Sequence, residues 1–208
     1  MNIDWENLGF KFMPTRSNIR FHYENGSWDE GRLCSDYNIT VSVAANVFHY
    51  GQAIFEGGKA FRCRDGKVRI FRPEENGKRL NSSARHLMMP EFPVEKFVEA
   101  VKTVVRDNVD YIPPYGTGGA LYIRPVMFGT TPQIGVGASL AYELVIMVVP
   151  VGVGMRMDRN MVTTNTTAAI RPIITMSYSE NAFFLDSIKN PPNLICFIYH
   201  IANMVCRK

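Results

Sequence analysis

The sequence predicts an α+β fold in which a mainly antiparallel β-sheet carries two helices on one face. Three observations support this class: two hairpin signals in the first third of the chain, two proline-initiated helices in the middle, and two long apolar strands after them. Strands that precede and follow a pair of helices, without regular β-α alternation, favour such a domain over a parallel sheet. The hydrophobic content of 46% and the charged content of 20% are typical of a globular protein.

Two dipeptides mark hairpins in the N-terminal part of the chain. Asn25-Gly26 separates two partly aromatic runs in IRFHYENGSWDEGRL, and both residues tolerate the positive φ that a two-residue hairpin turn needs. Asp65-Gly66 marks a second hairpin in GKAFRCRDGKVRIF. Between them, ITVSVAANVF (residues 39–48) continues with β-branched residues, which favour a strand.

Two prolines introduce the helices. Pro73 occupies the first helical position that proline prefers, and Glu74 and Glu75 suit the positive end of the helix dipole. The narrow apolar side of this helix consists of Leu80, Ala84, Leu87 and Met88. Pro93 opens a second helix with a broader core face at helical spacing. This face consists of Phe97, Val98, Val101, Val104 and Val105.

Two long strands follow the helices. DYIPPYGTGG, with its prolines and glycines, ends the second helix. The apolar runs ALYIRPVMF and YELVIMVVPVG then predict two strands, joined by the loop GTTPQIGVGAS. These strands complete the predicted sheet.

Composition argues against several classes of partner. The net charge of +4 is small and scattered, so we expect no nucleic-acid partner. The N-terminus is acidic where a signal peptide is basic, and the longest apolar stretches are too short to span a bilayer, so we expect a cytoplasmic protein without a membrane partner. The cysteines and histidines show no metal-ligand spacing, so we expect reduced thiols and no metal. They are Cys34, Cys63, Cys196, Cys206, His22, His49, His86 and His200.

The composition changes near Gly154. All 16 glycines lie at or before this residue, whereas average usage predicts about four in residues 155–208. This C-terminal part holds five of the 11 methionines and shows neither strand alternation nor a helical period. We therefore expect residues 1–154 to form one domain and residues 155–208 to be an atypical tail.

Arg79 is the first candidate for a binding site. Arginine makes planar, bidentate, always-charged contacts with phosphate and carboxylate groups. Asn76, Asn81 and Ser83 lie on the same predicted helix and offer further polar groups. A phosphate-binding face and an ordinary solvated helix face are both compatible with this spacing.

Two further segments carry aromatic or charged residues of interest. Tyr50 and Phe55 lie among glycines that permit a close backbone approach, which suits a substrate-facing loop and an ordinary corner of a sheet equally well. Tyr122 and Arg124 are two residues apart in a strand and hence share a face. A charged residue in this apolar run requires a partner or an anion, so the pair is a candidate carboxylate site.

Four motifs, DWENLGF, HYGQAIFEGGKAFR, FRPEENGKRLNSSA and GGALYIRPVMFG, occur in order between about residues 3 and 154. Together they resemble the branched-chain amino acid aminotransferases of the class IV pyridoxal-phosphate family. The resemblance implies the small N-terminal domain of the D-amino acid aminotransferase-like fold. It also implies pyridoxal 5'-phosphate as cofactor, a homodimer, and transamination of leucine, isoleucine or valine with 2-oxoglutarate, which makes branched-chain amino acids and 2-oxo acids the substrates.

The resemblance assigns roles to matching residues. Arg79 would hold the cofactor phosphate. Tyr50 and Phe55 would line the pocket for aliphatic side chains, and Tyr122 would lie beside it. Arg124 would meet the distal carboxylate of glutamate in the same pocket.

The resemblance also concerns a loop and one departure. Ile134 and Val136 lie in the loop that would reach the active site of the partner subunit. Gly58 stands where the family more often has leucine, which would loosen local packing.

The resemblance ends near residue 154, so the large C-terminal domain is missing or disrupted in this sequence. The family motif GxxKVGGNYA, with the Schiff-base lysine, has no counterpart, because the remaining lysines, Lys189 and Lys208, do not match it. We therefore assign no catalytic residue and expect residues 1–208 alone to be inactive, with a foreign or frame-shifted tail. The alternatives are another class IV enzyme, such as a D-amino acid aminotransferase or an aminodeoxychorismate lyase, and a non-catalytic binding remnant.

Overall fold

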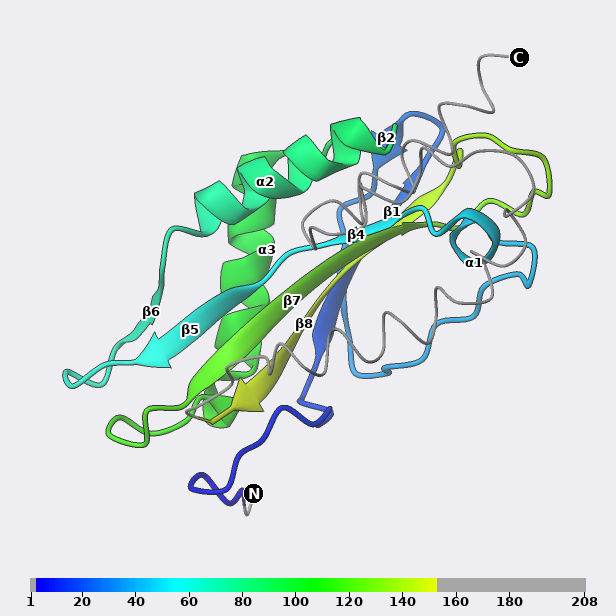
Figure 1. Ribbon diagram of the computed structural model, residues 1–208. Helices are drawn as coiled ribbons and strands as arrows, with labels where there is room; N and C mark the ends of the chain where they lie inside the picture. Colours follow the sequence, from blue (N-terminus) through cyan, green and yellow to red (C-terminus); the bar gives the residue numbers. More distant parts are fainter. Residues whose placement is uncertain (1–2, 153–208) are drawn as a thin grey trace, which may run out of the picture. The chain divides into compact units, whose positions relative to one another are not determined.

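The fold is a twisted antiparallel sheet with two helices packed against one face, as the sequence predicts (Figure 1). The structure, a computed structural model, describes residues 3–152. The strands are β1 (Asn18–Glu24), β2 (Ser27–Trp28), β3 (Arg32–Cys34), β4 (Ala53–Phe55), β5 (Gly58–Arg62), β6 (Val68–Ile70), β7 (Ala120–Gly129) and β8 (Tyr142–Val151). The helices are α1 (Asn46–Tyr50), α2 (Pro73–His86), α3 (Val94–Asp107) and the 3-10 turn η1 (Val109–Tyr111). The predicted tail, residues 155–208, lies outside the described residues.

The two long strands form the centre of the sheet. The strand order is β2-β1-β8-β7-β5-β6, with β3 also paired to β1 and β4 also paired to β7. β7 and β8 pair along their whole length, from Ala120 opposite Val151 to Gly129 opposite Tyr142. Both predicted hairpins are confirmed, since β1 pairs with β2 and β5 pairs with β6 in antiparallel register.

Alternation along β7 separates a core face from an uncovered face. Leu121, Ile123 and Met127 are buried in one hydrophobic cluster with residues of α2 and α3. Tyr122 and Arg124 point to the opposite face and are half-buried. Neither α2 nor α3 packs on that face, although the Phe10 ring contacts Tyr122 edge-on with 5.1 Å between the ring centres, so the half-buried Tyr122 and Arg124 remain partly accessible to a ligand.

The two long helices match their predicted starts closely. Pro73 is the first residue of α2, and Pro93 immediately precedes α3. One expectation was wrong: Met88 does not extend the apolar side of α2, because the helix ends at His86 and Met88 turns outward with φ 54 and 65% of its surface exposed.

The expected strand at residues 39–48 was also wrong. The segment forms a loop followed by α1, and only Ala45 makes an isolated bridge to Pro132. The Asn46 backbone N–H donates to the Thr131 carbonyl at 3.0 Å, and its side-chain amide donates to the Gly137 carbonyl at 2.9 Å. Tertiary contacts with the loop after β7 therefore override the local preference of β-branched residues.

Replacing Gly26 or Gly31 by alanine should change the stability by different amounts, although the two glycines have similar backbone conformations. Gly26 and Gly31 both have positive φ, 84° and 76°, but a Cβ at Gly26 would meet nothing within 4 Å, whereas a Cβ at Gly31 would overlap the buried Phe21 ring. We expect Gly26→Ala to cost about 1 kcal/mol of unfolding free energy, for its left-handed backbone alone. Gly31→Ala is expected to cost about 1–3 kcal/mol more, because of the overlap. Urea denaturation of both variants measures the difference, and equal losses would show that Phe21 yields without strain.

Candidate functional site

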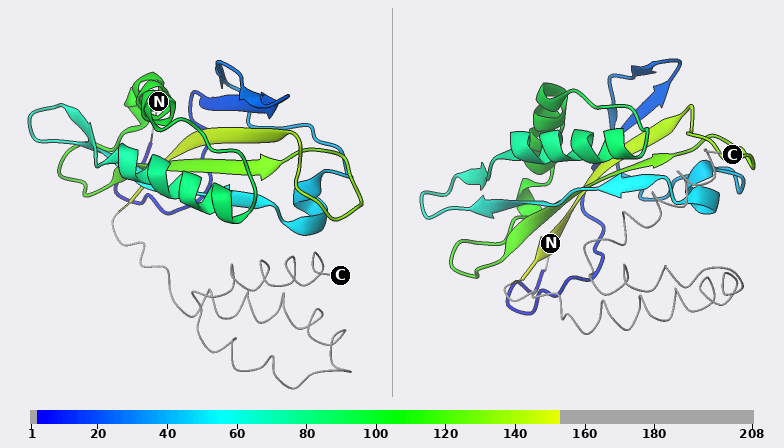
Figure 2. Two further views of the ribbon diagram at one scale, coloured as in Figure 1. Left: turned by 90° about the horizontal axis from the view of Figure 1, so that it is seen from above. Right: turned by 45° about the horizontal axis from the view of Figure 1, so that its top comes forward.

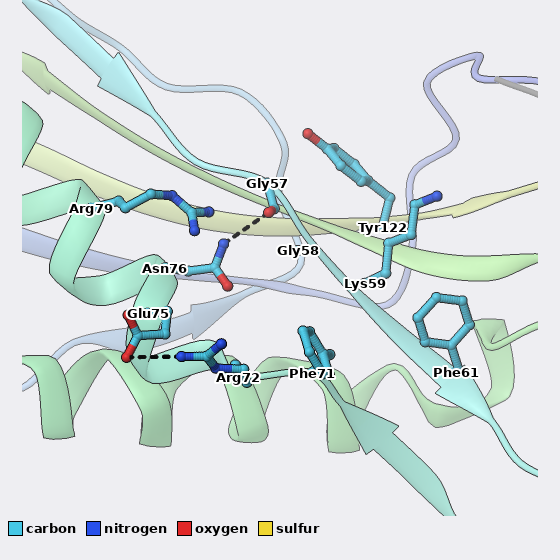
Figure 3. A pocket seen from close by; sticks show the side chains of 10 residues that line it. All are labelled: Gly57, Gly58, Lys59, Phe61, Phe71, Arg72, Glu75, Asn76, Arg79 and Tyr122. Carbon is cyan, nitrogen blue, oxygen red and sulfur yellow. Dashed lines mark hydrogen bonds and ion pairs between the residues drawn. The ribbon is translucent and has the colours of Figure 1, made fainter. Parts of the chain in front are cut away.

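An open pocket of about 530 Å³ lies between β5, the first half of α2 and β7 (Figure 3). Its lining residues are Gly57, Gly58, Lys59, Phe61, Phe71, Arg72, Glu75, Asn76, Arg79 and Tyr122. The lining includes three cations and one carboxylate. This excess of positive charge suits an anionic ligand.

Arg79 is fixed by a carboxylate that the sequence analysis did not identify. Its Nε donates to Glu56 Oε1 at 3.2 Å, and its Nη2 donates to Glu56 Oε2 at 2.7 Å. Asn76 Nδ2 donates both to Glu56 Oε2, at 3.0 Å, and to the Gly57 carbonyl, at 2.9 Å. The hydrogen bond to Glu56 is the main cause of a raised pKa of Arg79. Figure 3 shows the side chains of Arg79 and Asn76 reaching from α2 toward Gly57.

Only part of the predicted polar face of α2 contributes to this pocket. Asn76 does so, but Asn81 is buried, and its amide bonds both the N–H and the carbonyl of Phe92 at 2.8 Å. Asn81 therefore holds the segment before α3 in place, and its side-chain amide is engaged there rather than offered to a ligand. Ser83 is not among the residues that line the pocket.

Tyr122 and Arg124 form a cluster with Phe55 on the uncovered face of the sheet. Arg124 Nε donates to the Tyr122 hydroxyl at 3.0 Å, which confirms that the two side chains share a face. The Arg124 guanidinium carbon lies 4.5 Å from the centre of the Phe55 ring and 5.2 Å from that of Tyr122. The charge thus rests on aromatic faces, which attract cations.

Gly57 allows this cluster to lie against the pocket. A Cβ at Gly57 would come within 2.7 Å of the Tyr122 hydroxyl oxygen, closer than packed atoms allow. The absence of a side chain therefore lets Tyr122 reach from β7 to the backbone beside Glu56. This is the close backbone approach that the glycines of HYGQAIFEGG predict.

Tyr50 contacts the loop that carries Ile134 and Val136. The Tyr50 hydroxyl donates to the Ile134 carbonyl, and the side chains of Ile134 and Val136 are exposed. Among residues 3–152, no hydrogen bond or ring contact joins Tyr50 directly to Phe55, and their shared pocket role stays a prediction. In both views of Figure 2, α1 lies at the end of the sheet opposite the β5–β6 hairpin.

Gln52 was also missed, and it joins the two regions. Its Nε2 donates to the Leu87 carbonyl at the end of α2, at 2.9 Å, and its Oε1 accepts from the Ser139 N–H at the same distance. The side chain is buried, so both of its polar groups need such partners. Gln52 thereby fixes the loop of Ile134 and Val136 relative to the helix that carries Arg79.

Gly58 predicts a stabilising substitution. A Cβ there would lie 3.9 Å from Asn76 Oδ1 and from Ile123, which is ordinary contact distance. Glycine inside a strand is less stable than alanine, so we expect Gly58→Ala to raise the free energy of unfolding by about 0.5–1 kcal/mol. Gly57→Ala is the matched control and should lower it, because of the Tyr122 hydroxyl. Thermal unfolding of both variants checks this, and a destabilised Gly58→Ala would show that the backbone needs glycine.

The remaining titratable groups do not form a second candidate site in the described part of the chain. His22 Nδ1 lies 2.8 Å from Glu143 Oε1, and Cys34 and Cys63 are free thiols. Between residues 3 and 152, no three histidine, cysteine or acidic side chains are grouped as metal ligands. No helix there is long and apolar enough to cross a membrane. Lys189, Cys196, His200, Cys206 and Lys208 lie outside the described residues.

Comparison with curated proteins finds clear similarity over most of the chain. It is 40% identical over 167 residues to a branched-chain-amino-acid aminotransferase of Haemophilus influenzae, covering 79% of this chain and 49% of that protein. A second such protein, from Helicobacter pylori, is 41% identical over 151 residues, covering 73% and 44%. The chain thus spans about half the length of these relatives. No protein-family profile matches the sequence.

Solved structures give the same result for the fold. The branched-chain aminotransferase of Thermoproteus uzoniensis with norvaline matches with a TM-score of 0.52 and 26% identity, covering 65% of this chain and 41% of that one. The branched-chain amino acid aminotransferase of Thermobaculum terrenum, in its holo form with pyridoxal 5'-phosphate, matches with a TM-score of 0.51 and 24% identity, covering 66% and 40%.

Proposed function

Since the described domain belongs to the branched-chain amino acid aminotransferase family, we propose that it provides the phosphate-binding and side-chain-binding parts of a pyridoxal 5'-phosphate-dependent transaminase. The substrates are leucine, isoleucine or valine together with 2-oxoglutarate. One observation carries the proposal: Arg79 and Tyr122 line the same pocket, and Tyr122 links it to Arg124 on the uncovered face.

The residues of the pocket fit the phosphate of this cofactor. A guanidinium has five N–H donors, and Glu56 takes one from Nε and one from Nη2 of Arg79, which leaves three for a bidentate contact with phosphate. Arg79 is the residue that would hold the group, while both amide donors of Asn76 are engaged by Glu56 and the Gly57 carbonyl. When bound, the cofactor supplies the chemistry that accepts and returns the amino group.

The Phe55, Tyr122 and Arg124 cluster supports recognition of two kinds of substrate. An aliphatic side chain needs an apolar wall, which the exposed Phe55 ring offers. Glutamate needs a cation for its distal carboxylate, which Arg124 offers. A partly exposed cation–π contact is worth only about 0.5–1 kcal/mol, so the guanidinium can leave the Phe55 ring at low cost.

A homodimer and a cytoplasmic location are part of the same proposal. The exposed apolar side chains of Ile134 and Val136 suit a contact with the active site of a partner subunit. The small net charge of +4 gives no support for a nucleic-acid partner. We also propose a domain boundary near Gly154, where the glycine content changes.

Residues 1–208 are expected to show no amino transfer by themselves. The sequence lacks the lysine motif of the family, so no positioned base is available for the proton transfer that transamination requires. The measurement is leucine-dependent glutamate formation in the presence of pyridoxal 5'-phosphate, with a blank that lacks leucine. Glutamate formation above the blank by the homogeneous protein would contradict this expectation.

A chimera tests the substrate class directly. Residues 3–152 would replace the matching part of the Haemophilus influenzae relative, so that a complete C-terminal part is supplied. We expect the chimera to transaminate leucine, and its Arg79→Ala variant to lose most of this activity. Activity with D-alanine or aminodeoxychorismate instead of leucine would favour another class IV enzyme, and a folded but inactive chimera would favour a binding remnant.

A further inference from the structure

Glu56 is held more firmly than the arginine that it contacts. It lies between β4 and β5, and its backbone N–H donates to the Pro125 carbonyl of β7 at 3.0 Å. Its side chain is 11% exposed, whereas that of Arg79 is 60% exposed. The amide of Asn76 adds a second donor to the same carboxylate, at 3.0 Å. The carboxylate is therefore the anchored member of the pair, and it holds the more exposed side chain of Arg79.

The contact engages one edge of the Arg79 guanidinium and leaves another unoccupied. Glu56 accepts from Nε and Nη2, which form the side edge of the group. No hydrogen bond to Nη1 occurs among residues 3–152, so the end edge, made by Nη1 and Nη2, keeps its donors for the pocket. A carboxylate and a phosphate can thus bind the same arginine without sharing a donor.

We propose that Glu56 is a positioning residue that holds Arg79 with its end edge presented to an anionic phosphate. This inference rests on the proposed function, in which Arg79 binds the phosphate of a pyridoxal-type cofactor. An exposed arginine has several free rotatable bonds, and restricting them beforehand reduces the entropy lost on binding. Glu56 performs this restriction before the ligand arrives.

A purely electrostatic role and a positioning role for Glu56 predict opposite effects of its removal on phosphate affinity. A carboxylate beside the site repels a phosphate and cancels the charge of Arg79. If Glu56 were only a counter-ion, then removing its charge would strengthen phosphate binding. If it positions Arg79, the same change weakens binding. The sign of the change in affinity separates the two roles.

The test uses the 208-residue chain, titrated with pyridoxamine 5'-phosphate and with inorganic phosphate by calorimetry at low salt. Glu56→Gln removes the charge and leaves only one oxygen as acceptor, and Glu56→Asp keeps the charge but is one methylene too short. We expect both variants to lower the affinity for either ligand by about tenfold. Without Glu56 in its native position, the Arg79 side chain must be immobilised when the ligand binds, and this ordering reduces the affinity. Glu75→Gln is the matched control, since it removes a carboxylate from the same pocket without any hydrogen bond to Arg79, and should strengthen binding.

The outcomes of these titrations separate the two inferences. Tighter binding by Glu56→Gln, or unchanged binding by Glu56→Asp, would overturn the positioning role while leaving the proposed function intact. An unchanged affinity in Arg79→Ala, or no binding by the unaltered chain, would instead overturn the proposed function and this inference with it. If Glu56→Gln does not fold, the Nε–H signal of Arg79 in nitrogen-edited NMR spectra of Glu56→Asp gives the answer: positioning predicts that this signal moves and broadens, and an unchanged signal contradicts it.

Discussion

Arg79→Ala is expected to lower the affinity of the chain for pyridoxamine 5'-phosphate by about 10- to 100-fold, because hydrogen bonds to a charged group contribute about 1.5–3 kcal/mol each. Among the pocket residues that the structure describes, Arg79 is the arginine that a largely buried carboxylate fixes in place. Arg79→Lys keeps a positive charge but loses the planar, bidentate geometry, so we expect an intermediate loss. Calorimetric titration at fixed ionic strength gives all three affinities.

Pyridoxamine without its phosphate is the ligand control for this experiment. It should bind weakly and to the same extent in the unaltered chain and in Arg79→Ala, because it lacks the group that Arg79 recognises. Thermal unfolding of Arg79→Ala checks that the variant stays folded when Glu56 has lost the arginine and keeps only Asn76 as a side-chain partner. A variant that is folded and binds pyridoxamine 5'-phosphate as tightly as the unaltered chain would rule Arg79 out as the phosphate ligand.

Asn81→Ala is expected to lower the free energy of unfolding by about 2–5 kcal/mol, since each buried polar group that loses its partner costs about 1–3 kcal/mol. The side chain bonds both the N–H and the carbonyl of Phe92, and Phe92 is itself buried. Its removal therefore leaves two backbone groups without a partner, in addition to a cavity. The measurement is urea denaturation followed by circular dichroism.

Ser83→Ala is the matched control on the same helix. Ser83 is only half-buried, and we expect its replacement to change the free energy of unfolding by no more than about 0.5 kcal/mol. Equal stability of the two variants would mean that water satisfies the Phe92 backbone when Asn81 is absent. The structural role assigned to Asn81 would then be wrong.

Local chemistry explains why much of the fold could be predicted from the sequence. Asn25 and Gly26 adopt the positive φ that their dipeptide favours, and Pro73 begins α2 because proline suits that position. The same reasoning wrongly predicted a strand at residues 39–48, because Ala45 and Asn46 contact the loop after β7, which is far away along the chain. Sequence spacing carries no information about such a distant partner.

The candidate site was only partly predictable for a similar reason. The shared face of Tyr122 and Arg124 follows from strand alternation, and the structure confirms it. The structural role of Asn81 could not be predicted, because helical spacing does not reveal that the segment before α3 covers that side of α2. Glu56 was missed because its contact with Arg79 joins residues from two separate elements, although it is the only acidic residue in HYGQAIFEGGKAF.

The most direct test of the proposed site is to map where pyridoxamine 5'-phosphate binds to the 208-residue chain by nitrogen-edited NMR. Our proposal predicts that the signals of Gly57, the Asn76 amide and the Arg79 side chain shift during the titration, and that the same signals stay in place with pyridoxamine. The proposal would be contradicted if these signals did not shift, or if pyridoxamine 5'-phosphate and pyridoxamine shifted them equally.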